Sequence, residues 1–380
     1  MSERDLKRTL NHMVTYIDFS GDIIICSIRL HNYCNTVEDG QERSLQFLSA
    51  GGLNIVATAM TIHGGNADLQ GCCCMLISTA LTFVNGWENV SKTGISEAVI
   101  VAMERFPNHI DVQEYGCLAL ACITFDLEEV IPACTNGSAT AVLRALSKSP
   151  YENNIQMYGM LFISNLSFDL SSQSLMYALG IPDVVHQCLR RHMYSEIVLE
   201  GATSALANIT FMNTGSQIGL LKQGAVDTIL QIMDASGSET IVGYCARSLS
   251  FMYSTEDALD KYFRPDVIEA YKTLEERFPS LVKIRHSRLS VERVADPVVV
   301  ECVEKGVCVN SRFPLCSAEC KSATGSYCPT CCVQQKSFVC TQCDGEFSDI
   351  TYCESCWNRY HKGHKGKSYF YASRCRNVSN

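Results

Sequence analysis

Apolar positions in the first 290 residues follow the spacing of a helix face, and the whole pattern repeats every 43 residues. Within one repeat, Cys117, Leu120 and Ile123 lie three residues apart, which places them on one side of a helix. A small residue marks the same place in every repeat. We therefore predict a helix around each of these small residues, packed against the next unit: Cys73, Gly116, Gly159, Ala202 and Cys245.

A second marker keeps nearly the same period. Each of its glycines precedes a stretch such as Gly180-Ile-Pro-Asp-Val-Val, which predicts a turn followed by a helix, and Pro182 suits a first helical turn. Every unit should therefore contain at least two helices. The glycines are separated by 42, 43, 43 and 44 residues: Gly52, Gly94, Gly137, Gly180 and Gly224.

Two strings carry a resemblance to a known family, Gln113-Glu-Tyr-Gly-Cys-Leu-Ala-Leu and Gly201-Ala-Thr-Ser-Ala-Leu-Ala-Asn-Ile. The sequence resembles the armadillo-repeat family over roughly residues 10–290, with five units that hold both markers. Partial units are expected at residues 10–34 and 262–284. The resemblance implies an all-α fold, an armadillo-like α-solenoid superhelix. The alternative is an irregular helical bundle whose markers coincide by accident.

Such a solenoid implies a long groove that binds an extended segment of a partner protein. In the family, an asparagine late in the third helix of a repeat lines this groove and holds the partner's backbone. Asn165 and Asn208 occupy this position here, while Thr79, Cys122 and Phe251 stand in the equivalent places of other repeats. We expect Asn165 and Asn208 to contact a protein partner, with a structural helix-to-loop hydrogen bond as the alternative.

Charge divides the chain unequally. Residues 1–281 carry 17 basic and 31 acidic side chains, a net charge of −14, whereas residues 282–380 carry 14 and 9, a net charge of +5. An acidic body disfavours nucleic acid, because phosphate binding needs clustered cations. With only two tryptophans, the chain also departs from the import receptors of the family. The basic tail leaves nucleic-acid binding as a minor alternative.

Cysteine changes the picture near the C-terminus. The ten cysteines before residue 290 lie among apolar residues and should be buried, whereas the twelve from Cys302 to Cys375 lie in a segment too poor in large apolar side chains to form a core. We therefore divide the chain into helical repeats (1–290), a linker with cysteines (291–325), a zinc-binding domain (326–370) and a tail (371–380).

Eight side chains in this domain stand in four closely spaced pairs. Thiolates and imidazoles favour zinc, and a gap of two residues lets both members of a pair face one ion. Eight ligands suffice for two closed tetrahedral sites, so we predict two structural Zn²⁺ ions in a cross-braced domain. If the pairs alternate, one ion is bound by Cys328, Cys331, Cys353 and Cys356 and the other by Cys340, Cys343, His361 and His364.

The spacing C-x2-C-x8-C-x2-C, followed by C-x2-C-x4-H-x2-H, resembles the B-box zinc finger. The nine residues between Cys343 and Cys353 are more than the family usually has, so a ZZ-type finger remains the second assignment. Cys332 is an alternative ligand to Cys331. Four further thiols would suffice for a third zinc, with free or buried thiols as the simpler alternative: Cys302, Cys308, Cys316 and Cys320.

No motif for phosphate, dinucleotide, hydrolase or metalloprotease chemistry occurs in the sequence. We therefore expect a non-enzymatic scaffold whose solenoid binds a protein segment and whose zinc domain adds a second contact or self-association. A ubiquitin-ligase role of the zinc domain is the alternative. The first residues lack an apolar h-region, and no apolar run reaches the roughly 18 residues that span a bilayer, so we expect a reducing cytoplasmic or nuclear setting without membrane contact.

Overall fold

The structure is a computed structural model that describes residues 3–84, 90–125, 129–167, 172–211, 213–254, 258, 261–262, 264–278, 281, 336–340, 351–353 and 366–370. The chain separates into two compact units, Met1–Thr228 and Ile229–Asn380, and each is described by itself. The predicted domain limits at 290, 325 and 370 fall at or beside residues outside these ranges.

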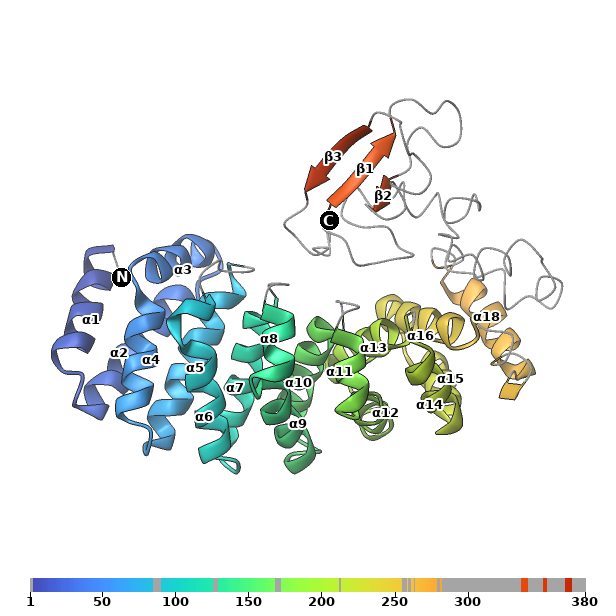
Figure 1. The fold of residues 1–380 in the computed structure, drawn as a ribbon, viewed down its shortest axis with the longest axis horizontal. Coiled ribbons are helices and arrows are strands. Elements are labelled where there is room, and N and C mark those ends of the chain that lie inside the picture. The colour runs from blue at the N-terminus through green and yellow to red at the C-terminus, as the bar shows by residue number, and fades with distance from the viewer. Residues whose placement is uncertain are drawn as a thin grey trace. The chain divides into compact units, whose positions relative to one another are not determined.

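The predicted helical repeats are confirmed, and the helices of the first unit follow one another in sequence order (Figure 1). Two helices precede the first repeat, and each repeat adds a short helix to the two that the markers predict. The pair is α1 (Glu3–Thr15) and α2 (Ser20–Cys34). The first repeat consists of α3 (Gly40–Ser49), α4 (Gly52–Ile62) and α5 (Ala67–Thr82). The second consists of the 3-10 helix η1 (Val90–Thr93), α6 (Ile95–Arg105) and α7 (Ile110–Ile123).

The later repeats keep this order of elements. They are α8 (Val130–Thr135), α9 (Ser138–Lys148), α10 (Asn153–Leu166); α11 (Gln173–Ala178), α12 (Ile181–Arg191), α13 (Glu196–Thr210); and α14 (Thr214–Lys222), α15 (Ala225–Ala235), α16 (Glu239–Met252). α18 (Pro265–Arg277) follows, within the segment predicted as the last partial unit.

The glycine before each second helix has a left-handed backbone, which explains why glycine recurs there. One marker was misplaced by a residue: the first left-handed glycine is Gly51 (φ 77°), not Gly52. The true spacing to Gly94 is therefore 43 residues. Gly52 is required for another reason, because a Cβ atom there would lie 2.3 Å from Cε2 of Phe47.

The third helices of the repeats pack on one another in order, α5 on α7, α7 on α10 and α10 on α13, and α2 of the N-terminal pair packs on α5. Their small-residue positions allow close contact with the second helix of the same repeat. A Cβ atom at Gly116 would lie 2.7 Å from Cγ of Met103, and one at Gly159 would lie 2.5 Å from Cδ2 of Leu146. The 43-residue marker is thus a packing requirement.

The expected burial of the scattered cysteines is confirmed for seven of the ten. Burial raises the pKa of the Cys73 and Cys117 thiols to about 12, so both remain uncharged at neutral pH. Cys72, Cys122 and Cys134 are half-buried. The other buried cysteines are Cys26, Cys34, Cys74, Cys188 and Cys245.

A row of buried glutamines joins the second and third helices of the first three repeats. In the second repeat, Nε2 of Gln113 donates to the carbonyl oxygens of Met103 (2.9 Å) and Phe106 (3.0 Å), at the end of α6. Gln70 and Gln156, 43 residues before and after, make the same two bonds in their own repeats. The fourth repeat has Leu199 at this place. These side-chain amides donate hydrogen bonds to carbonyl groups at the end of a helix, which have no partner within that helix.

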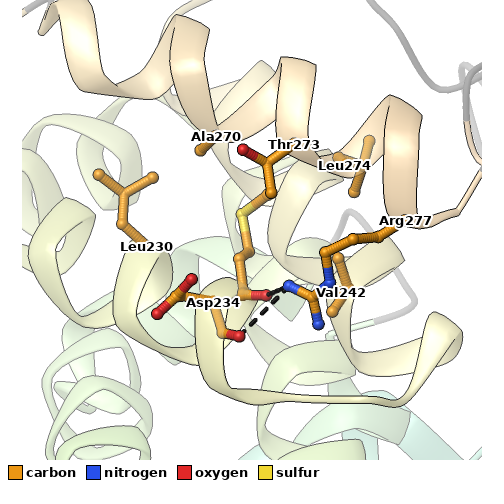
Figure 2. A pocket seen from close by; sticks show the side chains of 8 residues that line it. Leu230, Asp234, Val242, Ala270, Thr273, Leu274 and Arg277 are labelled. Atoms are coloured by element: carbon orange, nitrogen blue, oxygen red, sulfur yellow. Dashed lines mark hydrogen bonds between the residues drawn. The ribbon is translucent and has the colours of Figure 1, made fainter.

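In the second unit, an arginine replaces this amide. The guanidinium of Arg277 on α18 donates to the carbonyl oxygens of Met233 (2.7 Å) and Asp234 (3.3 Å) at the end of α15 (Figure 2). It also donates to the carbonyl oxygen of Ser236 (2.5 Å). The residue at the glutamine position of this repeat is the apolar Val242. α18 therefore supplies the missing donor from outside the repeat.

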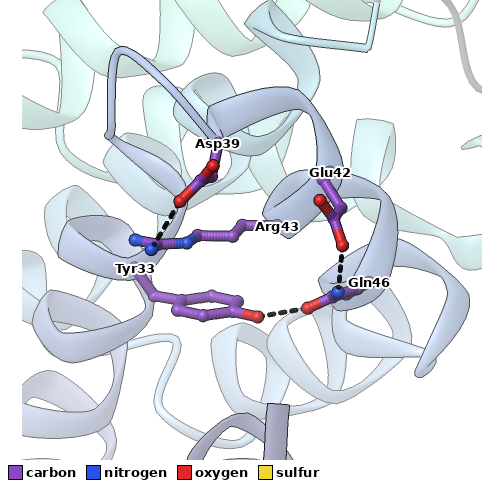
Figure 3. A network of polar contacts seen from close by, with 5 residues as sticks. All are labelled: Tyr33, Asp39, Glu42, Arg43 and Gln46. Carbon is purple, nitrogen blue, oxygen red and sulfur yellow. Dashed lines mark hydrogen bonds and ion pairs between the residues drawn. The ribbon is translucent and has the colours of Figure 1, made fainter. Parts of the chain in front are cut away.

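A polar network joins the N-terminal helix pair to the first repeat (Figure 3). The guanidinium of Arg43 lies 5.4 Å from the ring centre of Tyr33 and donates to Oδ2 of Asp39 at 2.9 Å. The Tyr33 hydroxyl donates to Oε1 of Gln46, whose Nε2 donates to Glu42 at 3.1 Å. These contacts fix α2 against α3 before the regular repeats begin.

Three strands in the second unit form an antiparallel sheet in the order β2-β1-β3. They are β1 (Lys336–Cys340), β2 (Thr351–Cys353) and β3 (Gly366–Phe370). Among the helices that the structure describes, none alone is long and apolar enough to cross a membrane, although α3 and α4, bent by 67° at their junction, meet that test together.

Candidate functional site

The solvent-facing sides of α5, α7, α10 and α13 form the most informative surface of the first unit, and we call it the third-helix face. It carries apolar side chains that the core does not cover. Leu161 on α10 is 40% exposed and Ile197 on α13 is 51% exposed. The half-buried members are Met75, Tyr115, Leu118 and Tyr158.

Two tyrosines stand at the same position of adjacent repeats on this face, Tyr115 on α7 and Tyr158 on α10. Burial raises the pKa of Tyr158, and the negative charges of Glu114 and Tyr115 raise it further. The pKa of Tyr115 is raised by its burial and by Glu114, Asp111 and Cys72. Each tyrosine is therefore affected by residues of the preceding third helix, Cys72 for Tyr115 and Tyr115 for Tyr158.

The third-helix face is acidic, because none of its four helices contains a lysine or an arginine. Its carboxylates form no ion pair with a lysine or arginine in the described part of the chain. Glu114 accepts a hydrogen bond from Nδ2 of Asn154 at 3.1 Å, and Asp68 lies 3.4 Å from Nε2 of His109. The carboxylates are Asp68, Asp111, Glu114, Glu196 and Glu200.

Both asparagines predicted to contact a partner form hydrogen bonds within the stack. Nδ2 of Asn165 donates to the carbonyl oxygen of Ala121 at 2.8 Å, and Nδ2 of Asn208 donates to that of Ser164 at 3.3 Å. Each bond reaches back 44 residues to the preceding third helix, and Sγ of Cys122 makes a similar contact with Ser78 at 3.7 Å. Asn165 is buried and Asn208 is half-buried. Partner contact by these residues remains a prediction.

Only two of the eight predicted zinc ligands lie on described residues. Cys340 ends β1 and pairs with Gly366, while Cys353 ends β2 and pairs with Ser337. The other six, Cys328, Cys331, Cys343, Cys356, His361 and His364, lie outside the described residues, as do Cys302, Cys308, Cys316, Cys320 and Cys332. Within the ranges that the structure describes, no three His, Cys, Asp or Glu side chains are close enough to share a metal ion.

A small pocket lies between α15, α16 and α18 in the second unit (Figure 2). Its volume is about 80 Å³, below the roughly 300 Å³ at which small-molecule sites begin. Its walls are largely aliphatic and include Leu230, Val242 and Leu274, and Arg277 is committed to the helix end beside it. The pocket therefore serves the packing of α18 better than it would serve a ligand.

The histidines of the repeats fill structural roles, as expected. His186 is buried, with Nδ1 3.3 Å from Oε1 of Gln223 and Nε2 3.1 Å from Oγ1 of Thr228. Nε2 of His192 lies 2.9 Å from the carbonyl oxygen of Pro150. Nδ1 of His109 accepts a bond from the backbone N–H of Val112 at the start of α7.

Single motifs in the sequence do not reveal the acidic and aromatic rows of the third-helix face. The signal was present, since Tyr115 and Tyr158 are 43 residues apart, as are Asp68 and Asp111. Comparing polar and aromatic positions at the same offset as the apolar ones would have revealed both rows. The offset alone does not say which side of the helix faces solvent.

Comparison with known proteins yields similarity of fold. No protein-family model matches the sequence, and no match was found among curated proteins. Solved structures do match, 33 chains in all. Two of them are crystal structures of engineered proteins, each 17% identical with a TM-score of 0.56, covering 67% of this chain and 98% or 100% of their own. At this identity, the match supports a helical-repeat fold and nothing about function.

Proposed function

We propose that this chain is a non-enzymatic scaffold of the armadillo-repeat type, which binds a segment of a partner protein along the third-helix face. One observation carries the proposal: four adjacent helices expose apolar and aromatic side chains beside carboxylates that have no lysine or arginine partner among the described residues. Soluble proteins seldom expose a continuous apolar row without a use for it.

Binding would combine two contributions. Removing Leu118, Tyr158 and Leu161 from water would supply most of the affinity, because apolar burial is the main favourable term in association. The carboxylates, such as Glu114 and Glu200, would set the orientation and attract cationic partners. No bond is made or broken in this process, so the surface needs no nucleophile or general base.

The C-terminal segment would form a B-box-type domain with two structural zinc ions, one bound by Cys328, Cys331, Cys353 and Cys356 and the other by Cys340, Cys343, His361 and His364. The strand register supports this division. Cys353 lies opposite Ser337, three residues before Cys340, so the two cysteines are about 10 Å apart along the ladder. That separation favours different ions. The domain would provide a second contact or self-association.

Binding and metal content can be tested on the full-length chain. Leu161→Lys introduces a charge into the apolar row, and Val101→Lys introduces the same charge at a 55% exposed position on α6. In a pull-down, partner proteins should be retained by the wild type and by Val101→Lys but not by Leu161→Lys. Once purified, these partners should bind the wild-type chain directly. A purified partner that binds all three forms equally would contradict the proposal.

Metal analysis of the same preparation should give two zinc ions per chain, or three if the upstream cysteines also bind. Cys340→Ser should lower the content to one. A folded C-terminal domain without zinc would contradict the metal assignment while leaving the binding face untouched.

A further inference from the structure

We infer that the partner segment on the third-helix face is a proline-rich, basic stretch in the polyproline II conformation, with an apolar residue at every third position. The inference rests on the proposed function and names the partner of the same face. Four properties of the face, its spacing, aromatic content, charge and hydrogen-bond donors, lead to it.

The spacing of the apolar row selects the conformation. Leu118 and Leu161 occupy equivalent positions on neighbouring third helices, and packed helices lie about 8–10 Å apart. A polyproline II helix rises 3.1 Å per residue with three residues per turn, so it returns to the same side about every 9.3 Å. An extended strand does so about every 6.7 Å, and an α-helix about every 5.4 Å. Of these three repeat lengths, that of polyproline II matches the spacing of packed helices most closely.

The aromatic row suits proline. Tyr115 and Tyr158 are half-buried and lie on adjacent helices, so each offers part of a rigid ring to the surface. Aromatic-lined surfaces are a recurrent means of binding proline-rich segments, because the proline rings are flat, apolar and already ordered. The conformational entropy lost on binding is correspondingly small.

Charge selects the residues between the prolines. The four helices carry five acidic side chains and no lysine or arginine, and Glu114 on α7 is adjacent to Tyr115. A lysine or arginine in each turn of the partner would meet these carboxylates, whereas an acidic segment would be repelled.

The hydrogen bonds of the face argue against a ligand that needs its backbone paired. One N–H of each amide, at Asn165 and at Asn208, is already bonded to the carbonyl oxygen of Ala121 or Ser164, and Asn165 is buried. The peptide groups of an extended strand bound at this surface would need hydrogen bonds from these side chains. A polyproline II segment has no internal hydrogen bonds, and its backbone remains solvated. It can therefore bind through side chains alone.

The test is fluorescence anisotropy with the full-length chain and four labelled peptides of equal length. The first repeats Leu-Pro-Lys; the second has the same composition in an order that breaks the three-residue spacing of leucine; the third replaces proline by alanine; the fourth replaces lysine by glutamate. The first should bind at least about tenfold more tightly than each of the others. Leu161→Lys should weaken it by about tenfold, and Val101→Lys by less than about twofold.

The outcomes separate this inference from the proposed function. If the second, third or fourth peptide binds as tightly as the first and shows the same dependence on Leu161, the polyproline II assignment is wrong and the binding face stands. If no peptide binds the wild type more tightly than it binds Leu161→Lys, the inference fails. If purified protein partners also bind the wild type and Leu161→Lys equally, the proposed binding face is wrong as well.

Discussion

The side-chain amide of Asn165 donates to the carbonyl oxygen of Ala121, 44 residues earlier, at 2.8 Å. This bond joins the last turns of two neighbouring third helices, α7 and α10. Asn208 repeats it one unit later with a longer bond of 3.3 Å. A position that suggested partner contact in the sequence is therefore also a connection between repeats.

Asn165→Ala should destabilise the chain by about 1–3 kcal/mol, because it leaves the Ala121 carbonyl without this donor in a buried place. Asn208→Ala should cost less, since its bond is longer and its side chain is half-buried. Urea unfolding followed by circular dichroism measures both. Equal midpoints for Asn165→Ala and the wild type would show that the bond contributes nothing.

Substitution of Gly51 or Gly52 by alanine, at the junction of α3 and α4, should destabilise the chain, for a different reason at each position. Gly51→Ala forces a Cβ atom onto a left-handed residue (φ 77°) and should cost about 1–2 kcal/mol, although no atom lies within 4 Å. Gly52→Ala should cost at least as much, because Phe47 must move.

Gly21, inside α2 and without neighbours within 4 Å, is the matched control. Gly21→Ala should stabilise the chain by up to about 1 kcal/mol through helix propensity. Thermal unfolding compares the three variants. A stabilised Gly51→Ala variant would contradict the left-handed assignment of that residue.

Gln113→Leu tests the glutamine row. It removes both bonds at the end of α6 and should destabilise the second repeat by about 1–3 kcal/mol, despite a similar side-chain volume. Gln187→Leu on the exposed side of α12 should change stability by less than about 0.5 kcal/mol. If the two variants unfold at the same urea concentration, the row does not stabilise the repeats.

Two histidines with lowered pKa values, His31 (half-buried) and His186 (buried), should make the chain less stable in acid. Burial lowers the pKa of His31 and, together with Arg190, that of His186. At His186 the hydrogen bond that its ring donates to Oε1 of Gln223 and the charge of Asp183 oppose the shift. The unfolded chain therefore binds protons first, near the ordinary value of about 6.5. Stability is complete above that pH and is lost as the pH falls towards the lowered values.

The difference between wild type and a His31→Gln, His186→Gln double variant isolates this effect. Between about pH 7.5 and pH 5.5, the wild type should lose more stability than the variant. Only in the wild type does the unfolded chain gain protons at these two positions more readily than the folded chain. Parallel losses in urea unfolding would assign the acid sensitivity to other groups.

Much of the fold follows from the 43-residue period, because the positions that fit a helix against its neighbours must recur. The period did not distinguish Gly51 from Gly52, since both are essential for different reasons. Nor did it reveal α8 and α11, which are six residues long and too short to show an apolar period. The sequence placed Asn165 correctly on the third helix, but the direction of its amide depends on the neighbouring backbone.

The proposed binding face is tested most directly by hydrogen–deuterium exchange of the full-length chain with and without a purified partner or the Leu-Pro-Lys peptide. A ligand on the third-helix face should slow exchange in α7, α10 and α13 and leave the second helices α6, α9 and α12 unchanged. Protection confined to α6, α9 and α12, or to residues 326–370, would contradict the account.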